Sequence, residues 1–139
     1  MISVTLNQNG NPAKVTESGE LVVAPLSFDE TKFNELAEDD TAYNFYEPKP
    51  NKQFVITSML AYGDKQVGSQ TNATVEVYEA ASSDSTTVLK CLIKFEIGQN
   101  QAIPFTPLRV LVKEGVWVNA KTDDDDIHMT VMGYYINAL

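Results

Sequence analysis

The chain has 139 residues, of which 43% are hydrophobic, and its formal net charge is −9. This length fits a single domain with a substantial core, because about 70% of the extended-chain surface can be buried at this size. An acidic chain without a basic cluster is repelled by phosphates, which argues against nucleic acid and an anionic membrane as partners. The N-terminus does not resemble a secretory signal and no apolar run could cross a bilayer, so we expect a soluble protein made in a cytoplasm.

Residues 1–20 are predicted to form a short strand followed by a long loop or an extended arm. The strand candidate is ISVTL, residues 2–6, and the segment NQNGNPAKVTESGE after it is rich in turn formers with nothing to bury. Loops of this length are often functional, and an arm that reaches a neighbouring subunit is the alternative. We assign residues 21–139 to one domain.

Residues 21–63 alternate between apolar stretches and turn formers. Three strands are expected, LVV at residues 21–23, TAYNFYE at 41–47 and QFVITSMLAYG at 53–63. Both faces of the third are apolar, which places it inside a sandwich and near a subunit contact. SFDETKFNELAEDD, residues 27–40, has the only helical spacing of the chain and predicts one or two helical turns or an irregular polar connection.

Two strands of alternating character are expected in the middle of the chain. ATVEVYEA, residues 73–80, has Val75 and Val77 inward, and VLKCLIKFEIG, residues 88–98, is the clearest half-buried strand. The inward face of the second is predicted to carry Leu89, Cys91, Ile93, Phe95 and Ile97. Cys91, the only cysteine, cannot form an intramolecular disulfide, and we interpret it as a small core residue.

The stretch GVWVNAKTDDDDIHMTVMGYYI, residues 115–136, is predicted to form a C-terminal hairpin with an acidic turn. Val116, Val118 and Ala120 face inward in its first strand. Trp117 then faces outward and must be covered by a loop or by a neighbouring subunit. The inward set of the second strand is predicted to be Ile127, Met129, Val131, Gly133 and Tyr135.

The chain contains about eight expected strands, including LRVLVKEG at residues 108–115, at the spacing typical of sandwiches and barrels. Strands do not alternate with helices along the chain, which excludes a parallel α/β sheet. We therefore predict an all-β fold, a single antiparallel β-sandwich of jelly-roll type.

Little catalytic chemistry is visible in the sequence. One histidine and one cysteine leave little room for nucleophilic catalysis or a transition-metal site. We interpret His128 as a solvated side chain and expect no cofactor and no enzymatic activity. The aspartates that follow Thr122 are interpreted as a solvated turn, with a calcium site made by Asp123, Asp124 and Asp126 as the alternative.

Aromatic side chains on outward strand faces are typical of protein interfaces and of sugar-binding platforms. Core filling and a subunit interface are the preferred interpretations here, with carbohydrate stacking third. Leu92 joins them because it interrupts the polar face of its strand. The residues predicted to form an interface are Trp117, Leu92, Met132, Tyr134 and Tyr78.

Three stretches resemble a group of small structural proteins from tailed bacteriophages. They are AYNFYEPKPNKQFVITSMLAYGDKQVG, ATVEVYEAASSDSTTVLK and GVWVNAKTDDDDIHMTVMGYYI, and the resembling region runs from about Leu21 to the C-terminus. Head decoration proteins, head fibres and tail-associated adhesion domains belong to this group. The resemblance implies a β-sandwich component of the virion that assembles as a trimer or on a symmetric lattice, and it brings no catalytic residues.

The expected function is that of a non-enzymatic virion structural protein, a capsid decoration (cement) protein that binds and stabilises a phage head. Its expected partners are itself, as a homotrimer, and the major capsid protein or other virion proteins. It would be synthesised in the host cytoplasm and located in the virion. The alternative is a carbohydrate- or receptor-binding β-sandwich module of a phage tail or fibre. A cupin-like enzyme is a weaker option, because such sites need several histidines.

Overall fold

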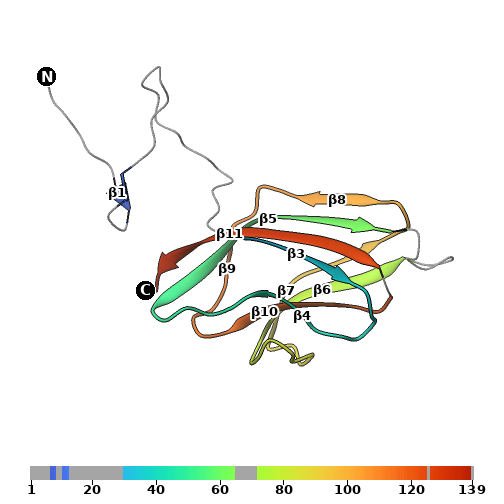
Figure 1. Cartoon of the computed structure of the whole chain (residues 1–139), viewed down its shortest axis with the longest axis horizontal. Helices are drawn as coiled ribbons and strands as arrows, with labels where there is room; N and C mark the ends of the chain where they lie inside the picture. Colours follow the sequence, from blue (N-terminus) through green and yellow to red (C-terminus); the bar gives the residue numbers. More distant parts are fainter. Residues whose placement is uncertain (1–6, 9–10, 13–29, 65–71, 125, 139) are drawn as a thin grey trace, which may run out of the picture.

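The described chain is an antiparallel β-sandwich (Figure 1). The computed structural model describes residues 7–8, 11–12, 30–64, 72–124 and 126–138. These residues form strands and connections without any helix, so the predicted all-β sandwich is confirmed. The expected strands at residues 2–6 and 21–23 lie outside the described residues. Near the N-terminus, β1 (Asn7–Gln8) and β2 (Asn11–Pro12) pair with each other.

Two larger sheets make up the two layers of the sandwich. The first sheet has the order β4 (Tyr43–Tyr46), β10 (Trp117–Thr122), β6 (Ala73–Ala80) and β7 (Lys90–Ile97). The second has the order β3 (Glu30–Leu36), β11 (Ile127–Asn137), β5 (Lys52–Gly63) and β8 (Ala102–Phe105), and β9 (Val110–Leu111) also pairs with β5. All pairings are antiparallel.

The prediction of helical turns within residues 27–40 is wrong for the part that the structure describes. Residues 30–36 form β3, which pairs with β11 along its whole length. The spacing of Phe33 and Leu36 suits one helical face, but in the strand the two side chains point to opposite sides. Leu36 is buried in the core and Phe33 is exposed. Pairing with β11 therefore overrides a weak local preference.

The predicted C-terminal hairpin is also wrong, although its alternation is right. β10 and β11 belong to different sheets, and each has both edges paired with other strands. Val118 and Ala120 of β10 are fully buried, as are Ile127 and Met129 of β11. The period of two therefore identified the inward side chains, but it could not identify the partner strands.

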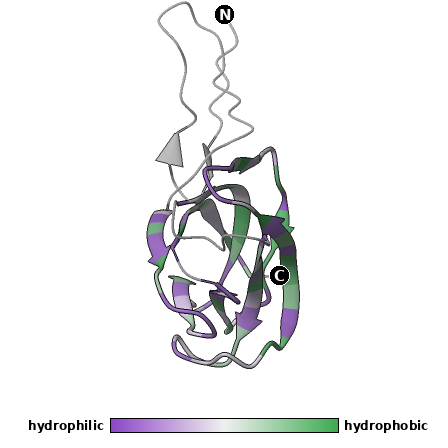
Figure 2. Cartoon of the chain, turned by 90° about the vertical axis from the view of Figure 1, so that its right-hand side faces the viewer, coloured by the Kyte–Doolittle hydropathy of each residue, from purple (hydrophilic) through white to green (hydrophobic). Residues whose placement is uncertain are grey.

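The core fills the space between the two sheets, and Figure 2 shows hydrophobic and hydrophilic segments alternating along the strands that enclose it. At one end, the Tyr46 and Phe54 rings stack with their centroids 4.5 Å apart. Tyr135 lies 5.3 Å from Phe54 and completes the cluster. Burial is the main cause that raises the pKa of the Tyr135 phenol. The cluster therefore ties the C-terminal part of β11 to β4 and β5.

The prediction that Cys91 is a core residue is wrong, because Cys91 is exposed. The register between β6 and β7 shifts at Val77 and Tyr78, which pair with Ile93 and Cys91 respectively. Leu92 is the extra residue of this β-bulge. A bulge reverses the facing of the residues beyond it. Leu92 consequently packs against the core instead of facing outward, and Cys91 moves to the outer surface.

Tyr78 is fully buried within the chain, so its predicted place at a subunit interface is wrong. The segment 81–89 folds over this part of the first sheet. The Tyr78 hydroxyl donates to the Ser85 carbonyl at 2.8 Å, and the buried Asn119 amide donates to the Ser82 and Ser85 carbonyls at 2.9 and 3.1 Å. The protein thereby covers its own outward aromatic residue with a hydrogen-bonded loop.

Gly133 has a steric role in β11, since a Cβ there would collide with the Val55 carbonyl oxygen and the Phe54 ring. We predict that Gly133→Ala lowers the free energy of unfolding by about 2–3 kcal/mol, measured by urea denaturation. Gly115→Ala is the matched control. Gly115 has φ 79° and open space around a Cβ, so its substitution costs only the backbone term of about 1 kcal/mol. A smaller loss at Gly133 than at Gly115 would contradict this packing.

Candidate functional site

The aspartates after β10 act as hydrogen-bonding groups of the turn. Asp123 Oδ1 accepts from the Thr74 amide at 2.6 Å, and the Asp124 amide donates to the Thr122 hydroxyl at 3.3 Å. Asp126 has φ 61°, and its carbonyl accepts from the Asp64 amide at 3.0 Å. Within the described ranges, no group of three or more His, Cys, Asp or Glu side chains is placed to hold a metal ion.

The cysteine and the histidine do not form a catalytic pair. Cys91 lies on the outer side of the first sheet and His128 on the outer side of the second, so the whole sandwich separates them. Burial and the neighbouring Glu76 raise the pKa of the Cys91 thiol, which keeps it protonated and weakly nucleophilic. The described residues therefore offer no thiol–imidazole chemistry.

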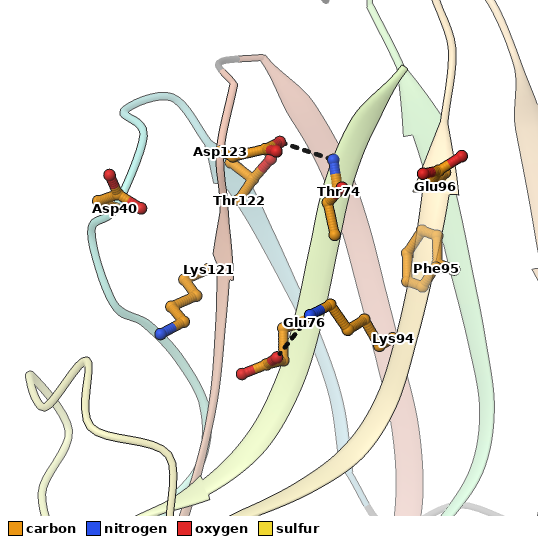
Figure 3. A pocket seen from close by; sticks show the side chains of 9 residues that line it. All are labelled: Asp40, Thr74, Glu76, Lys94, Phe95, Glu96, Lys121, Thr122 and Asp123. Carbon is orange, nitrogen blue, oxygen red and sulfur yellow. Dashed lines mark hydrogen bonds and ion pairs between the residues drawn. The ribbon is translucent and has the colours of Figure 1, made fainter. Parts of the chain in front are cut away.

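A polar groove of about 500 Å³ lies on the outer side of the first sheet (Figure 3). Its lining consists of Asp40, Thr74, Glu76, Lys94, Phe95, Glu96, Lys121, Thr122 and Asp123. One ion pair crosses the groove, since Lys94 Nζ lies 3.6 Å from Glu76, while Lys121 Nζ donates to the Thr86 carbonyl at 3.0 Å. The Phe95 ring packs on Phe105 at 4.8 Å, so the groove lacks a free stacking platform.

A different surface stands out on the outer side of the second sheet. Five large hydrophobic side chains are exposed among the described residues, and four of them lie here. Phe33 is 56% exposed, Leu60 46%, Tyr62 37% and Leu111 45%, while the fifth, Leu89, lies beyond this sheet. Half-buried Met132 and Tyr134 of β11 lie between them. We call this surface the apolar face: Phe33, Leu60, Tyr62, Leu111, Met132 and Tyr134.

Strand register places two exposed residues of the apolar face, Phe33 and Leu60, at the same level of the sheet. Phe33 of β3 lies opposite Thr130 of β11, and Thr130 lies opposite Leu60 of β5. Leu60 in turn lies opposite Pro104 of β8. Directly paired residues of neighbouring strands have their Cβ atoms about 5 Å apart on the same side of the sheet. Phe33, Leu60 and Pro104 therefore lie in one row across four strands, with Thr130 between Phe33 and Leu60.

One end of the apolar face carries a polar cluster around His128. The imidazole lies between the Phe33 and Tyr62 rings, at centroid distances of 5.8 and 6.2 Å. Its Nε2 atom is 3.8 Å from Glu35 Oε1 and 3.7 Å from Asp64 Oδ2. This nitrogen is buried and makes no hydrogen bond, so the prediction of a solvated His128 is wrong at that atom.

The structure separates the five predicted interface residues. Met132 and Tyr134 belong to the apolar face. Trp117 is half-buried at the start of β10, where it pairs with Ala80 of the first sheet. Leu92 packs against the core and Tyr78 is covered by the segment 81–89.

Four members of this surface were not among the predicted interface residues, namely Phe33, Leu60, Tyr62 and Leu111. The signal for Leu60 was present, because apolar residues on both faces of 53–63 already predicted a nearby contact. Phe33 was hidden by its assignment to a helical segment.

Comparison with known proteins finds no matching family model, no matching curated protein and no matching solved structure. The described part of the chain also contains no helix that is long and apolar enough to span a membrane.

Removal of calcium should leave the thermal stability of the protein unchanged if the acidic turn is held by its own hydrogen bonds. We predict that the melting temperature in excess EDTA stays within about 1 °C of its value in millimolar calcium, because an ion that bound only the folded state would raise it. Differential scanning calorimetry measures this directly. A fall of several degrees in EDTA that calcium alone restores would establish a calcium site at Asp123, Asp124 and Asp126.

Proposed function

We propose that the chain is a non-enzymatic structural protein that works by laying its apolar face against another protein surface. The observation that carries this proposal is the gathering of Phe33, Leu60, Tyr62 and Leu111 on one outer sheet face. Large contiguous apolar patches are uncommon on soluble monomers and mark interaction sites. The centre of a protein interface is typically depleted in charge and rich in aromatic residues and Met, as this face is.

In its specific form, the proposal is a capsid decoration protein that binds and stabilises a phage head. The resemblance to structural proteins of tailed phages supports this role, with the major capsid protein or another virion protein as partner and the virion as location. The same resemblance implies a homotrimer. The difference between the two sheets supports the role as well, because the segment 81–89 covers Tyr78 on the first sheet, whereas Phe33 and Leu60 are exposed on the outer side of the second.

We also infer that the sandwich is of jelly-roll type. Its eight main strands form two four-stranded paths, β4-β10-β6-β7 and β3-β11-β5-β8. From β3 to β11 the chain crosses between the sheets six times, and only the connections from β6 to β7 and from β8 to β9 stay within one sheet, as two interlocked Greek keys require.

A carbohydrate- or receptor-binding module is the second candidate, and the end of the apolar face near His128 supports it. Phe33 and Tyr62 expose rings there beside the carboxylates of Glu35 and Asp64, and rings with carboxylates suit a sugar. However, Leu60 and Leu111 extend the surface well past these rings. A glycan array in which the intact chain binds, and Phe33→Ala and Tyr62→Ala do not, would favour this candidate over decoration.

The decoration proposal predicts that Leu60→Lys removes the protein from particles. A lysine at the centre of the apolar face would place an unpaired charge in the contact, which should weaken binding by about 2 kcal/mol or more, roughly 30-fold. Leu89→Lys is the matched control, since Leu89 is 56% exposed and lies outside the face. Purified particles are analysed by mass spectrometry after production with each variant.

We expect stoichiometric amounts of the unchanged chain and of Leu89→Lys in particles, and a strong depletion of Leu60→Lys. Absence of the unchanged chain from particles, or equal retention of both lysine variants, would contradict the proposal.

A further inference from the structure

We propose that the apolar face binds a second copy of this chain in a two-fold pair. The inference rests on the proposed function, because it names the partner of the same surface. A contact between identical chains across a two-fold axis uses the same patch on both copies, so the patch must be complementary to itself. Two features of the apolar face meet this requirement, namely the distribution of carboxylates and the placement of the single arginine.

Self-association of a chain with a net charge of −9 must avoid opposing its carboxylates. The outward side chains of β11 are His128, Thr130, Met132, Tyr134 and Ile136, and none of them is acidic. The outward residues of β5 are also free of carboxylates between Gln53 and Tyr62. The two central strands of this sheet therefore form a surface on which two acidic chains can meet without mutual repulsion.

The charges of this face lie near its ends, with Glu35 and Asp64 both beside His128 at one of them. Glu35 is on the edge strand β3, level with His128 and Tyr62, and its side chain is 49% exposed. Arg109, the only arginine of the chain, is exposed at the opposite edge, just before β9. Its neighbours Leu108 and Val110 both pack against the core, so strand alternation turns Arg109 outward.

Glu35 and Arg109 are also displaced along the strands. Glu35 lies at the level of Tyr62 of β5. The residues on either side of Arg109 contact β5 at a different level. Val110 pairs with Ile56, and the Leu108 amide donates to the Thr57 carbonyl at 2.7 Å. The two charges are therefore diagonally opposed across the face. A two-fold axis along the other diagonal places Glu35 of one copy against Arg109 of the second, twice by symmetry.

This arrangement makes the strands of the two copies cross at a large angle, which is one of the two common ways in which sheets pack face to face. Leu60 and Thr130 then lie at the centre of the contact, where water is excluded. The two ion pairs lie at the rim, where they contribute little to affinity but fix orientation. A two-fold contact produces pairs, so the trimer implied by the resemblance would need a second contact elsewhere on the molecule.

A charge-swap series tests the pairing in the intact chain. The dissociation constant of self-association is measured by analytical ultracentrifugation for the unchanged protein, Glu35→Arg, Arg109→Glu and the double variant. We expect the unchanged protein to be a dimer at micromolar concentration. In each single variant the dissociation constant should rise about tenfold or more, because like charges then face each other twice. In the double variant it should return to within about threefold of the value for the unchanged protein. Leu60→Lys should give monomers and Leu89→Lys should leave the dimer intact.

The controls separate this inference from the proposed function. Circular dichroism melting confirms that each variant is folded. A monomeric unchanged protein at about 100 μM, a trimer that the swaps leave unaltered, or a double variant as weak as the single variants would overturn the pairing. If the unchanged protein is monomeric but Leu60→Lys is still lost from particles, the pairing fails and the particle-binding role stands. If the dissociation constants of the charge-swap variants change as expected but particles lack the protein, the decoration role fails and the pairing stands.

Discussion

The structure depends on the position of β11, which is hydrogen-bonded to β3 on one edge and to β5 on the other over most of its eleven residues. In a strand that is paired on both edges, successive side chains point to the two faces of the sheet, so each face must carry side chains that suit its surroundings. One face supplies Ile127, Met129 and Val131 to the core, where all three are buried. The other face carries Met132 and Tyr134, which are half-buried. The fold and the proposed contact thus arise from the two sides of one strand.

The two outer faces of the sandwich are treated differently. On the first sheet, the segment 81–89 covers Tyr78 and gives the buried Asn119 its hydrogen-bond partners, so a ring and an amide that would otherwise meet water are enclosed. On the second sheet, Phe33 and Leu60 remain exposed and lie on either side of Thr130. Because Tyr78 is covered on the first sheet while Phe33 and Leu60 are exposed on the second, we propose the apolar face as the surface used in assembly.

Much of the fold could be predicted from the sequence, because the alternation of side chains along a strand is a local property. It identified the inward residues of β10 and β11 and the sandwich class. It failed where a single inserted residue changes the facing, as at Leu92, which sent Cys91 to the surface. It also failed for strand partners, since β10 and β11 pair in different sheets for reasons that lie far away in the sequence.

The candidate site was less predictable, because its residues come from strands that are brought together only by long-range pairing. Met132 and Tyr134 follow from the alternation of their own strand, and the two apolar faces of 53–63 indicated a contact near Leu60. Phe33 and Leu111 join the surface only through the pairing of β3 with β11 and of β9 with β5. Membership of a surface that crosses several strands is set by long-range register, which no local pattern contains.

The most direct test of the central claim, that the apolar face binds a second copy of this chain, is a dilution series followed by methyl NMR on the intact chain. The methyl resonances of Leu60, Leu111 and Met132 should shift progressively as the concentration rises from about 10 μM to 1 mM, because these groups become buried against a second protein surface. The methyl resonances of Leu89, which is exposed away from the face, should stay constant. Shifts that centre on Leu89, or constant resonances for all four residues over the whole range, would contradict the account.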